Sequence, residues 1–533
     1  MRTPVLIGVS VVVVGAAAGQ ALPEHRPFEG DWMLRTWSAF ASIADLPRSG
    51  PTAPVPRGAI GHPAATEGLW WSSGNPGALP FALTNAITVF EAGRTAVNGP
   101  YRFAMEPDDM SQFGVRATSW QPLGRSGGAV GAIVMDRTAA GVRPYAATLV
   151  PASTDPFIVT DTTTPEAARL RVRLEGAMGW RLGPIGFGAS IGLENDDHRS
   201  HNSGFQQVGR TAIPAGRVGV TYRAGRALHV GVHARWIREA QTLLMGPRPD
   251  EGMIFQLAGY AEPDTLVLAG GFGYFQRAER YARAHGVSAT GTILGTTWTT
   301  LLERTRRNNR YFYQVIFDPP SDRWIADGWT MSGTVARPLG RRFSVSFEAW
   351  RATVRGDATV ADLEGALFRA NENALKLGAT VRYAPAESRL SVEAGYSLWR
   401  TRRARYDFLS EVGMDLVTWA PGGWLAGGYR WGRSQVQASA SMASYSSVGS
   451  IPDAAQMGPV YQRVLAPEMA VAASRSRPLH TMLSYGHTLS NGTLLSVEGT
   501  LRTVSAGTDG AGGFTPTGQR TAWSIATRVT VTR

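Results

Sequence analysis

Apolar and polar side chains alternate along this sequence, most clearly between residues 170 and 193. One set of alternate positions is apolar: Leu170, Val172, Leu174, Met178, Trp180, Ile185, Phe187, Ala189, Ile191 and Leu193. The other set is charged or small: Arg171, Arg173, Glu175, Arg181, Gly186, Gly188, Ser190, Gly192 and Glu194. Because successive side chains of a strand point to opposite faces, the pattern predicts two strands with one apolar face. Gly183-Pro184 predicts the turn between them.

The same alternation begins near Ala86 and continues to the end of the chain. The apolar face of such a sheet must be covered, and no helical stretch with a matching apolar stripe occurs in the sequence. Strands with an apolar outside and a polar inside are typical of transmembrane barrels. We therefore predict an all-β fold, a single large antiparallel transmembrane β-barrel of roughly 16–22 strands with about 18 as the central value.

Three parts of the chain are expected. Residues 1–21 have a basic start, a short apolar run and small residues at the end, which predicts a secretory signal peptide. Residues 22–80 are irregular and rich in Pro, Gly and Ser, and we expect an extended N-terminal arm or plug, or a disordered lead-in. Residues 81–533 are expected to form the barrel.

Two classes of connection are predicted, as in barrels with short periplasmic turns and long outer loops. Short turns are expected at 183–184, 225–226, 338–341, 385–388 and 420–423. Longer polar loops are expected at 195–208, 238–252, 356–373, 401–410, 448–463 and 505–518. The alternation of the two classes fails after residue 425, since a turn at Gly432-Arg433 would put loop 448–463 on the wrong side.

Composition agrees with a barrel. The hydrophobic fraction is 43% and the mean hydropathy is −0.12, which is too polar for a helical membrane protein but suits strands that face water on one side. The absence of cysteine excludes disulfides and thiolate metal sites. The net charge is +12, carried by arginines spread along alternating strands, with Lys376 the one lysine. Such spreading argues against a nucleic-acid-binding patch.

Several segments resemble those of a family of uncharacterised outer-membrane β-barrel proteins, commonest in Bacteroidetes-like bacteria. The residues that carry the resemblance are Gly74–Leu79, Met105–Met110, Asp155–Asp161, Asp196–Asn202 and Gly216–Tyr222. The resemblance is strongest over residues 70–260. It implies a barrel in the bacterial outer membrane and no particular activity. The chain departs from outer-membrane barrels in ending at Val531-Thr532-Arg533 without the aromatic residue that the barrel-insertion machinery reads.

Inward-facing basic residues are the candidate functional site. The candidates for a lumen or ion pathway are Arg171, Arg173, Arg181, Arg217, Arg223, His229, His233 and Arg235. Rings of arginine in a pore favour anions, so the sequence predicts a pore or substrate transporter for a small anionic solute. If Arg171 and Arg173 instead pair with inward carboxylates, the barrel is closed and acts as a scaffold.

Enzymatic chemistry is expected to be absent. Asp196, Asp197 and His198 form a polar group in a predicted outer loop, and an Asp/His pair can activate water, so an outer-membrane hydrolase is the alternative. His229 and His233 lie about 13 Å apart along a strand, too far to share a metal ion, and no metal or cofactor is expected. A secreted β-sandwich or propeller is a third possibility, but no repeat of about 40–50 residues supports it.

The expected surroundings follow from the barrel. We predict a place in the bacterial outer membrane, with outer-membrane lipid, lipopolysaccharide and the barrel-insertion machinery as partners and with no nucleic acid. The substrate and the oligomeric state have no signature in the sequence.

Overall fold

The computed structural model describes residues 74–532 with gaps. The gaps are 83–85, 101–108, 142–156, 162–165, 203–204, 226–227, 246–252, 259–263, 268–273, 314–321, 360–365, 386–387, 453–465, 467–469, 471–472 and 507–517. The predicted signal peptide and residues 22–73 of the predicted arm lie outside the described residues.

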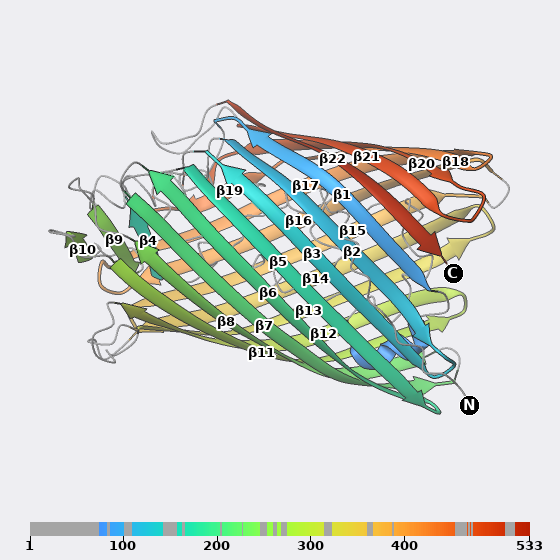
Figure 1. Cartoon of the computed structure of the whole chain (residues 1–533), viewed down its shortest axis with the longest axis horizontal. Helices are drawn as coiled ribbons and strands as arrows, with labels where there is room; N and C mark the ends of the chain where they lie inside the picture. Colours follow the sequence, from blue (N-terminus) through green and yellow to red (C-terminus); the bar gives the residue numbers. More distant parts are fainter. Residues whose placement is uncertain are drawn as a thin grey trace, which may run out of the picture.

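Antiparallel strands close into one barrel (Figure 1). Its last strand pairs with its first, from Ile87↔Thr532 to Asn98↔Thr521. The strands, in barrel order, are β1 (Ile87–Asn98), β2 (Asp109–Leu123), β3 (Gly127–Ala140), β5 (Glu166–Leu182), β6 (Ile185–Asn202), β7 (Phe205–Ala224), β8 (Leu228–Met245), β11 (Tyr274–Ile293), β12 (Thr296–Tyr313), β13 (Asp322–Leu339), β14 (Phe343–Thr359), β15 (Phe368–Tyr383), β16 (Leu390–Asp407), β17 (Val412–Trp431), β18 (Ser434–Ala443) with β19 (Ser446–Ser450), β20 (Ser476–Thr488), β21 (Leu494–Ala506) and β22 (Gln519–Thr532).

β18 and β19 are two parts of one barrel strand. Both pair with β17, which meets β18 over Gly422–Trp431 and β19 over Asp415–Trp419. Counted as one, they give an antiparallel barrel of 18 strands in the described part of the chain. The predicted all-β class and the central strand number are confirmed.

The turn predicted at 420–423 is wrong. These residues lie inside β17, where Pro421 pairs with Leu398 of β16. The chain reverses instead at Gly432-Arg433, where Gly432 takes a φ of 55°, a left-handed conformation that glycine adopts without strain. With this turn, the connection from β19 to β20 falls at the same end as the other long connections, and the alternation continues to the C-terminus.

Several strands run past the predicted loops. β6 and β7 together include most of 195–208, and β8 continues to Met245. The barrel strands from β5 to β17 have 16–20 residues, whereas about 9–11 are enough to span a membrane with tilt. The barrel wall therefore extends beyond the membrane at the end that carries the long connections. A small sheet of β4 (Phe157–Asp161), β9 (Met253–Ala258) and β10 (Asp264–Val267) lies at the same end (Figure 1).

The outer surface of the barrel is apolar. Exposed side chains on it include Leu170, Leu174, Ile185, Phe187, Ile191, Val220, Val230, Val232, Val287, Phe347, Leu425 and Leu483. A closed barrel has no unpaired strand edge, so an apolar exterior of this size is stable against lipid and not against water. The protein is a barrel of the bacterial outer membrane.

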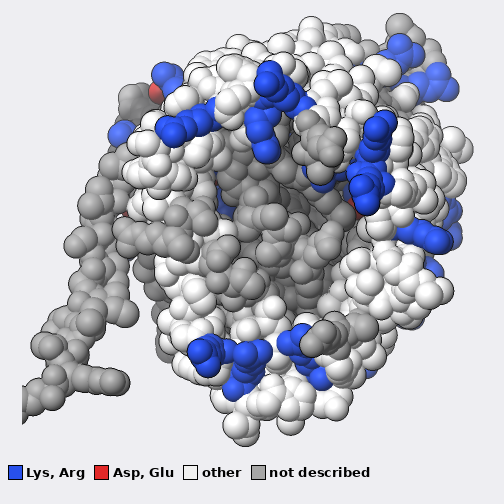
Figure 2. Space-filling view, turned by 90° about the vertical axis from the view of Figure 1, so that its right-hand side faces the viewer, with Lys and Arg blue, Asp and Glu red and all other residues white. Residues whose placement is uncertain are grey.

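The short turns lie at one end of the barrel, which Figure 2 views along the barrel axis. Basic side chains are spread around this rim, and exposed arginines in or beside the turns include Arg125, Arg341, Arg342, Arg389 and Arg433. We refer to this end as the turn end.

Inside the barrel near the turn end lies a short segment that precedes β1. It consists of η3 (Pro76–Ala78) and α3 (Leu79–Ala82), with Asn75 as the N-cap. We call residues 74–82 the inner segment. No helix in the described part of the chain is long and apolar enough to cross a membrane.

Candidate functional site

Asn75 anchors the inner segment to the barrel wall. Its Nδ2 donates hydrogen bonds to the carbonyl oxygens of Val220 on β7 and Val232 on β8, each 3.1 Å away. Its Oδ1 accepts a hydrogen bond of 2.9 Å from the backbone N–H of Gly77. The side chain is fully buried. A buried amide of this kind is stable only with its polar atoms bonded, so the contact fixes both the position and the direction of the segment.

A row of inward positions without large side chains receives the inner segment. The strand register places Gly179, Gly188 and Gly219 directly opposite one another on β5, β6 and β7. A Cβ at any of them would lie closer than 3.0 Å to an atom of Asn75 or Pro76, a distance real Cβ atoms essentially never show. The glycines therefore let the backbone of the segment lie directly on the backbone of the wall.

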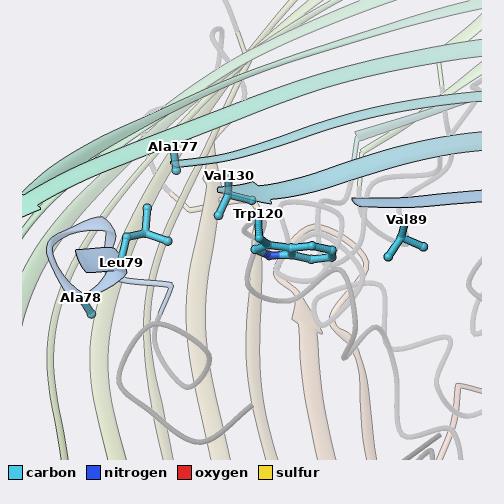
Figure 3. Close-up of a cluster of buried hydrophobic side chains, with 6 residues drawn as sticks. All are labelled: Ala78, Leu79, Val89, Trp120, Val130 and Ala177. Atoms are coloured by element: carbon cyan, nitrogen blue, oxygen red, sulfur yellow. The ribbon is translucent and has the colours of Figure 1, made fainter. Parts of the chain in front are cut away.

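Apolar side chains complete the site on the inner wall where the inner segment packs, which we call the seat. Leu79 is fully buried and packs with Trp120, Val130 and Ala177, which point inward from β2, β3 and β5 (Figure 3). Burying a leucine side chain contributes about 1.5–3 kcal/mol, and each hydrogen bond of Asn75 adds about 1 kcal/mol. The seat thus stabilises the docked segment by a few kcal/mol, which is small enough for the segment to be released.

The same row continues into a buried ionic cluster. Gly219 is opposite His233 on β8, which is opposite Gly286 on β11, which is opposite Glu303 on β12. A Cβ at Gly286 would overlap the imidazole of His233, so this glycine lets the ring lie across β11 and reach the next strand. There, His233 Nε2 lies 2.9 Å from Glu303 Oε2.

Glu303 also binds Arg235, whose guanidinium donates a hydrogen bond of 2.6 Å to Oε1. Arg217 lies directly opposite Arg235 in the strand register and is buried. Arg235 and His233 therefore share one carboxylate on the inner wall, and Arg217 lies beside Arg235. A cluster of this composition can hold a small anion beside the cations or remain closed around Glu303.

The other predicted lumen residues also lie on the inner face, with partners of their own. Arg171 donates to Asp136 on β3, with Nε 2.9 Å from Oδ2, and Arg173 forms an ion pair with Glu175. At the turn end, Arg181 lies over the ring of Phe81 of the inner segment at 6.0 Å, and that ring is 5.4 Å from the ring of His229.

Arg223, the remaining predicted residue, donates from Nε to the carbonyl oxygen of Gly225 at 3.1 Å. Neither Arg223 nor Arg181 forms an ion pair with a carboxylate within the described residues. Arg171, Arg173, His233 and Arg235 are thus paired with carboxylates on the wall, whereas Arg181 and His229 lie against Phe81 of the inner segment.

The prediction that Asp196, Asp197 and His198 lie in an outer loop is wrong. All three lie within β6. Asp196 and His198 are buried on the inner side, and Asp196 is held by Arg169. Asp197 points to the opposite side and accepts a hydrogen bond of 3.1 Å from Arg199. The loop was predicted because both faces of the strand are polar here, beyond the membrane, where the apolar alternation ends.

Several residues of the site were missed by sequence reasoning. Asn75 lies in an irregular stretch, and Asp136 and Glu303 lie on strands far from the arginines they bind. The alternation showed the row of inward glycines on β6, but it did not show that the inner segment packs against them. Within the described residues, no group of three or more His, Cys, Asp or Glu side chains is arranged to hold a metal ion.

Comparison with known families decides the relationship. A family of unknown function (DUF6850) matches residues 76–531. The chain belongs to this family. The match begins at Pro76 of the inner segment and ends within β22, and so continues far beyond residue 260, where the strongest part of the resemblance ends. A search among curated proteins found no match.

Solved structures with a similar outline are outer-membrane proteins of low sequence identity. The FrpB iron transporter from Neisseria meningitidis has a TM-score of 0.44 and 9% identity over 84% of this chain and 82% of that chain. The alcaligin outer-membrane receptor FauA from Bordetella pertussis has a TM-score of 0.42 and 9% identity over 84% and 76%. The copper transporter OprC has a TM-score of 0.38 and 11% identity over 83% and 80%.

Proposed function

We propose that this DUF6850 protein is a pore or substrate transporter of the outer membrane, not an enzyme, and that its inner segment narrows the lumen at the turn end. The observation that supports this is the seat of Asn75 on a row of glycines. A few hydrogen bonds and one leucine hold the segment, so a modest free energy separates the docked from a released state.

A small anionic solute is the proposed cargo. The pathway would pass Arg171, Arg173, Arg181, Arg217, Arg223, His229, His233 and Arg235. Arg181 and Arg223 would matter most for selectivity, because carboxylates neutralise much of the charge of Arg171, Arg173 and Arg235. A low-dielectric wall focuses the field of such charges into the lumen.

Ion selectivity in a planar bilayer tests the cargo. Purified protein should pass anions more readily than cations, and Arg181→Glu with Arg223→Glu should lower or reverse this preference. The change should be larger at low salt, where screening is weaker. Arg137→Glu changes an exposed residue on the outer surface of β3 and should leave selectivity unchanged. Cation selectivity in the unmodified protein would exclude an anion pathway.

A closed scaffold is the second candidate, and the ion pairs Arg171–Asp136, Arg173–Glu175 and Arg235–Glu303 favour it. Substitutions in the inner segment distinguish a pore from a scaffold. If it narrows a pathway, Asn75→Ala with Leu79→Ala should raise conductance several-fold by weakening the seat. If the barrel is a scaffold, conductance should be small in the unmodified protein and remain so in this variant.

A further inference from the structure

Outside the lumen, a set of arginines faces outward from β8, β11, β12 and β13. We call this set the outer arginine patch: Arg238, Arg283, Arg304, Arg306, Arg310 and Arg323, all exposed. On each strand they share the outward face with apolar residues nearer the turn end, such as Val232, Val287, Leu302 and Met331. The patch is therefore part of the outer surface and has no connection with the lumen.

The height of the patch along the barrel axis is set by the strand positions. Arg238, Arg283 and Arg306 each lie ten residues from the turn-end terminus of their strand. At about 3.3 Å per residue and a tilt of about 40°, ten residues rise about 25 Å, which is the height of the apolar band of an outer-membrane barrel. Trp329 lies exposed at the same level and Trp236 just below it, as interfacial aromatic residues do. Arg238, Arg283 and Arg306 therefore lie in the headgroup layer of the outer leaflet, and Arg310 and Arg323, nearer the other end of their strands, lie further out.

The register sets like charges directly against each other. Arg283 is opposite Arg306, and Arg310 is opposite Arg323. Directly opposed like charges destabilise a sheet unless something neutralises them. Two outward carboxylates lie among these residues. Asp327 is 3.3 Å from Arg304, and Glu279 binds Arg277 and Tyr281 and lies 3.9 Å from Arg238. They leave the patch with a net positive charge.

We propose that the outer arginine patch binds the phosphate groups of lipopolysaccharide in the outer leaflet. Guanidinium groups bind phosphate oxygens in a bidentate manner, and paired arginines suit a ligand with several negative charges. Lipid A places its phosphates at the boundary between acyl chains and sugar, which is the level of Arg238, Arg283 and Arg306. Its acyl chains would then lie along the apolar stripe below. This site is independent of the proposed transport function.

Lipid binding by native mass spectrometry of the purified, delipidated protein tests the site. The unmodified protein should retain diphosphoryl lipid A in preference to dephosphorylated lipid A and to phosphatidylglycerol. Arg283→Gln with Arg306→Gln should lower lipid A binding about tenfold or more, since each basic residue near a charged lipid surface contributes on the order of 1 kcal/mol. Arg341→Gln with Arg342→Gln removes the same charge at the turn end and should have no effect.

A variant that should bind lipid A more tightly provides the complementary test. Asp327→Asn removes a carboxylate that competes for Arg304, and it should tighten lipid A binding while the barrel keeps its heat-modifiable mobility. Equal loss in the two double variants would overturn the proposal, as would equal binding of phosphatidylglycerol and lipid A. An unchanged affinity in Arg283→Gln with Arg306→Gln would overturn it as well.

Discussion

At the residue scale, the cost of a charge on the outer surface depends on its depth in the membrane. Ile191 is exposed and lies six residues into β6, about 15 Å from the turn end and near the middle of the apolar band. Ile191→Arg should lower the free energy of unfolding by about 2–4 kcal/mol. Asn195→Arg, on the same face but four residues further out, should cost about 0–1 kcal/mol. Urea unfolding in lipid vesicles measures both, and equal losses would contradict the placement of the band.

A second prediction at this scale concerns Glu303, which neutralises cations on the inner wall. Glu303→Gln removes the carboxylate that His233 and Arg235 bind, and breaking a buried pair in this way typically costs about 3–5 kcal/mol. The exposed pair Arg402–Asp415 is the control, since surface pairs contribute about 0–1 kcal/mol. The free energies of unfolding of the Glu303→Gln and Asp415→Asn proteins should therefore differ by several kcal/mol.

The coupling between partners gives a stricter test. In a double-mutant cycle, Glu303→Gln and Arg235→Gln should show an interaction of about 0.5–3 kcal/mol, because the two side chains are in direct contact. Additive effects would mean that the cluster does not act as a unit.

The sequence predicted which face of the strand each inward arginine occupies, but it did not predict which carboxylate each one binds. Alternation placed Arg171, Arg173 and Arg235 on one side of their strands, since side chains in a strand have a period of two. The carboxylates they bind, Asp136 and Glu303, lie on other strands, and the sequence carries no signal for strand register across long connections.

At the element scale, the glycines opposite the inner segment should behave differently from other glycines of the wall. A Cβ at Gly179 would meet atoms of Pro76, Pro80 and Leu79, whereas one at Gly192 would meet Glu175 at an ordinary 3.5 Å. Gly179→Ala should therefore displace the segment and Gly192→Ala should not. The chain has no cysteine, so Ala78→Cys provides a single thiol at a site that is now buried.

Maleimide labelling of this thiol measures the displacement. Reaction should be slow in the Ala78→Cys protein and in its combination with Gly192→Ala, and several-fold faster with Gly179→Ala. Equal rates in all three proteins would show that the glycine row does not hold the segment.

Elements were predictable where the membrane imposes alternation. The hairpin of β5 and β6 and its turn at 183–184 followed from the sequence because lipid faces one side and water the other. Beyond the membrane both faces meet water, so the outer half of β6 was read as a loop. The inner segment has no periodic pattern at all, and its place depends on Asn75 and on glycines of distant strands.

At the scale of the whole molecule, closure into a barrel follows from an apolar exterior that no other layer covers. The orientation follows from the connections, since short turns gather at one end and long connections at the other. The error at 420–423 shows why the sequence could not fix the strand count alone, because Pro421-Gly422-Gly423 has the composition of a turn. Pairing with β16 and β18 overrides that local preference.

Sidedness in cells tests both the orientation and the level assigned to the outer arginine patch. Leu409 is exposed in the connection between β16 and β17, at the end opposite the short turns, and Arg341 is exposed in the turn between β13 and β14. In intact cells, a membrane-impermeant maleimide should label Leu409→Cys and leave Arg341→Cys unlabelled. After the outer membrane is permeabilised, both should react, which controls for buried thiols. Labelling of Arg341→Cys alone in intact cells would reverse the orientation, and it would move the patch from the lipopolysaccharide leaflet to the periplasmic one.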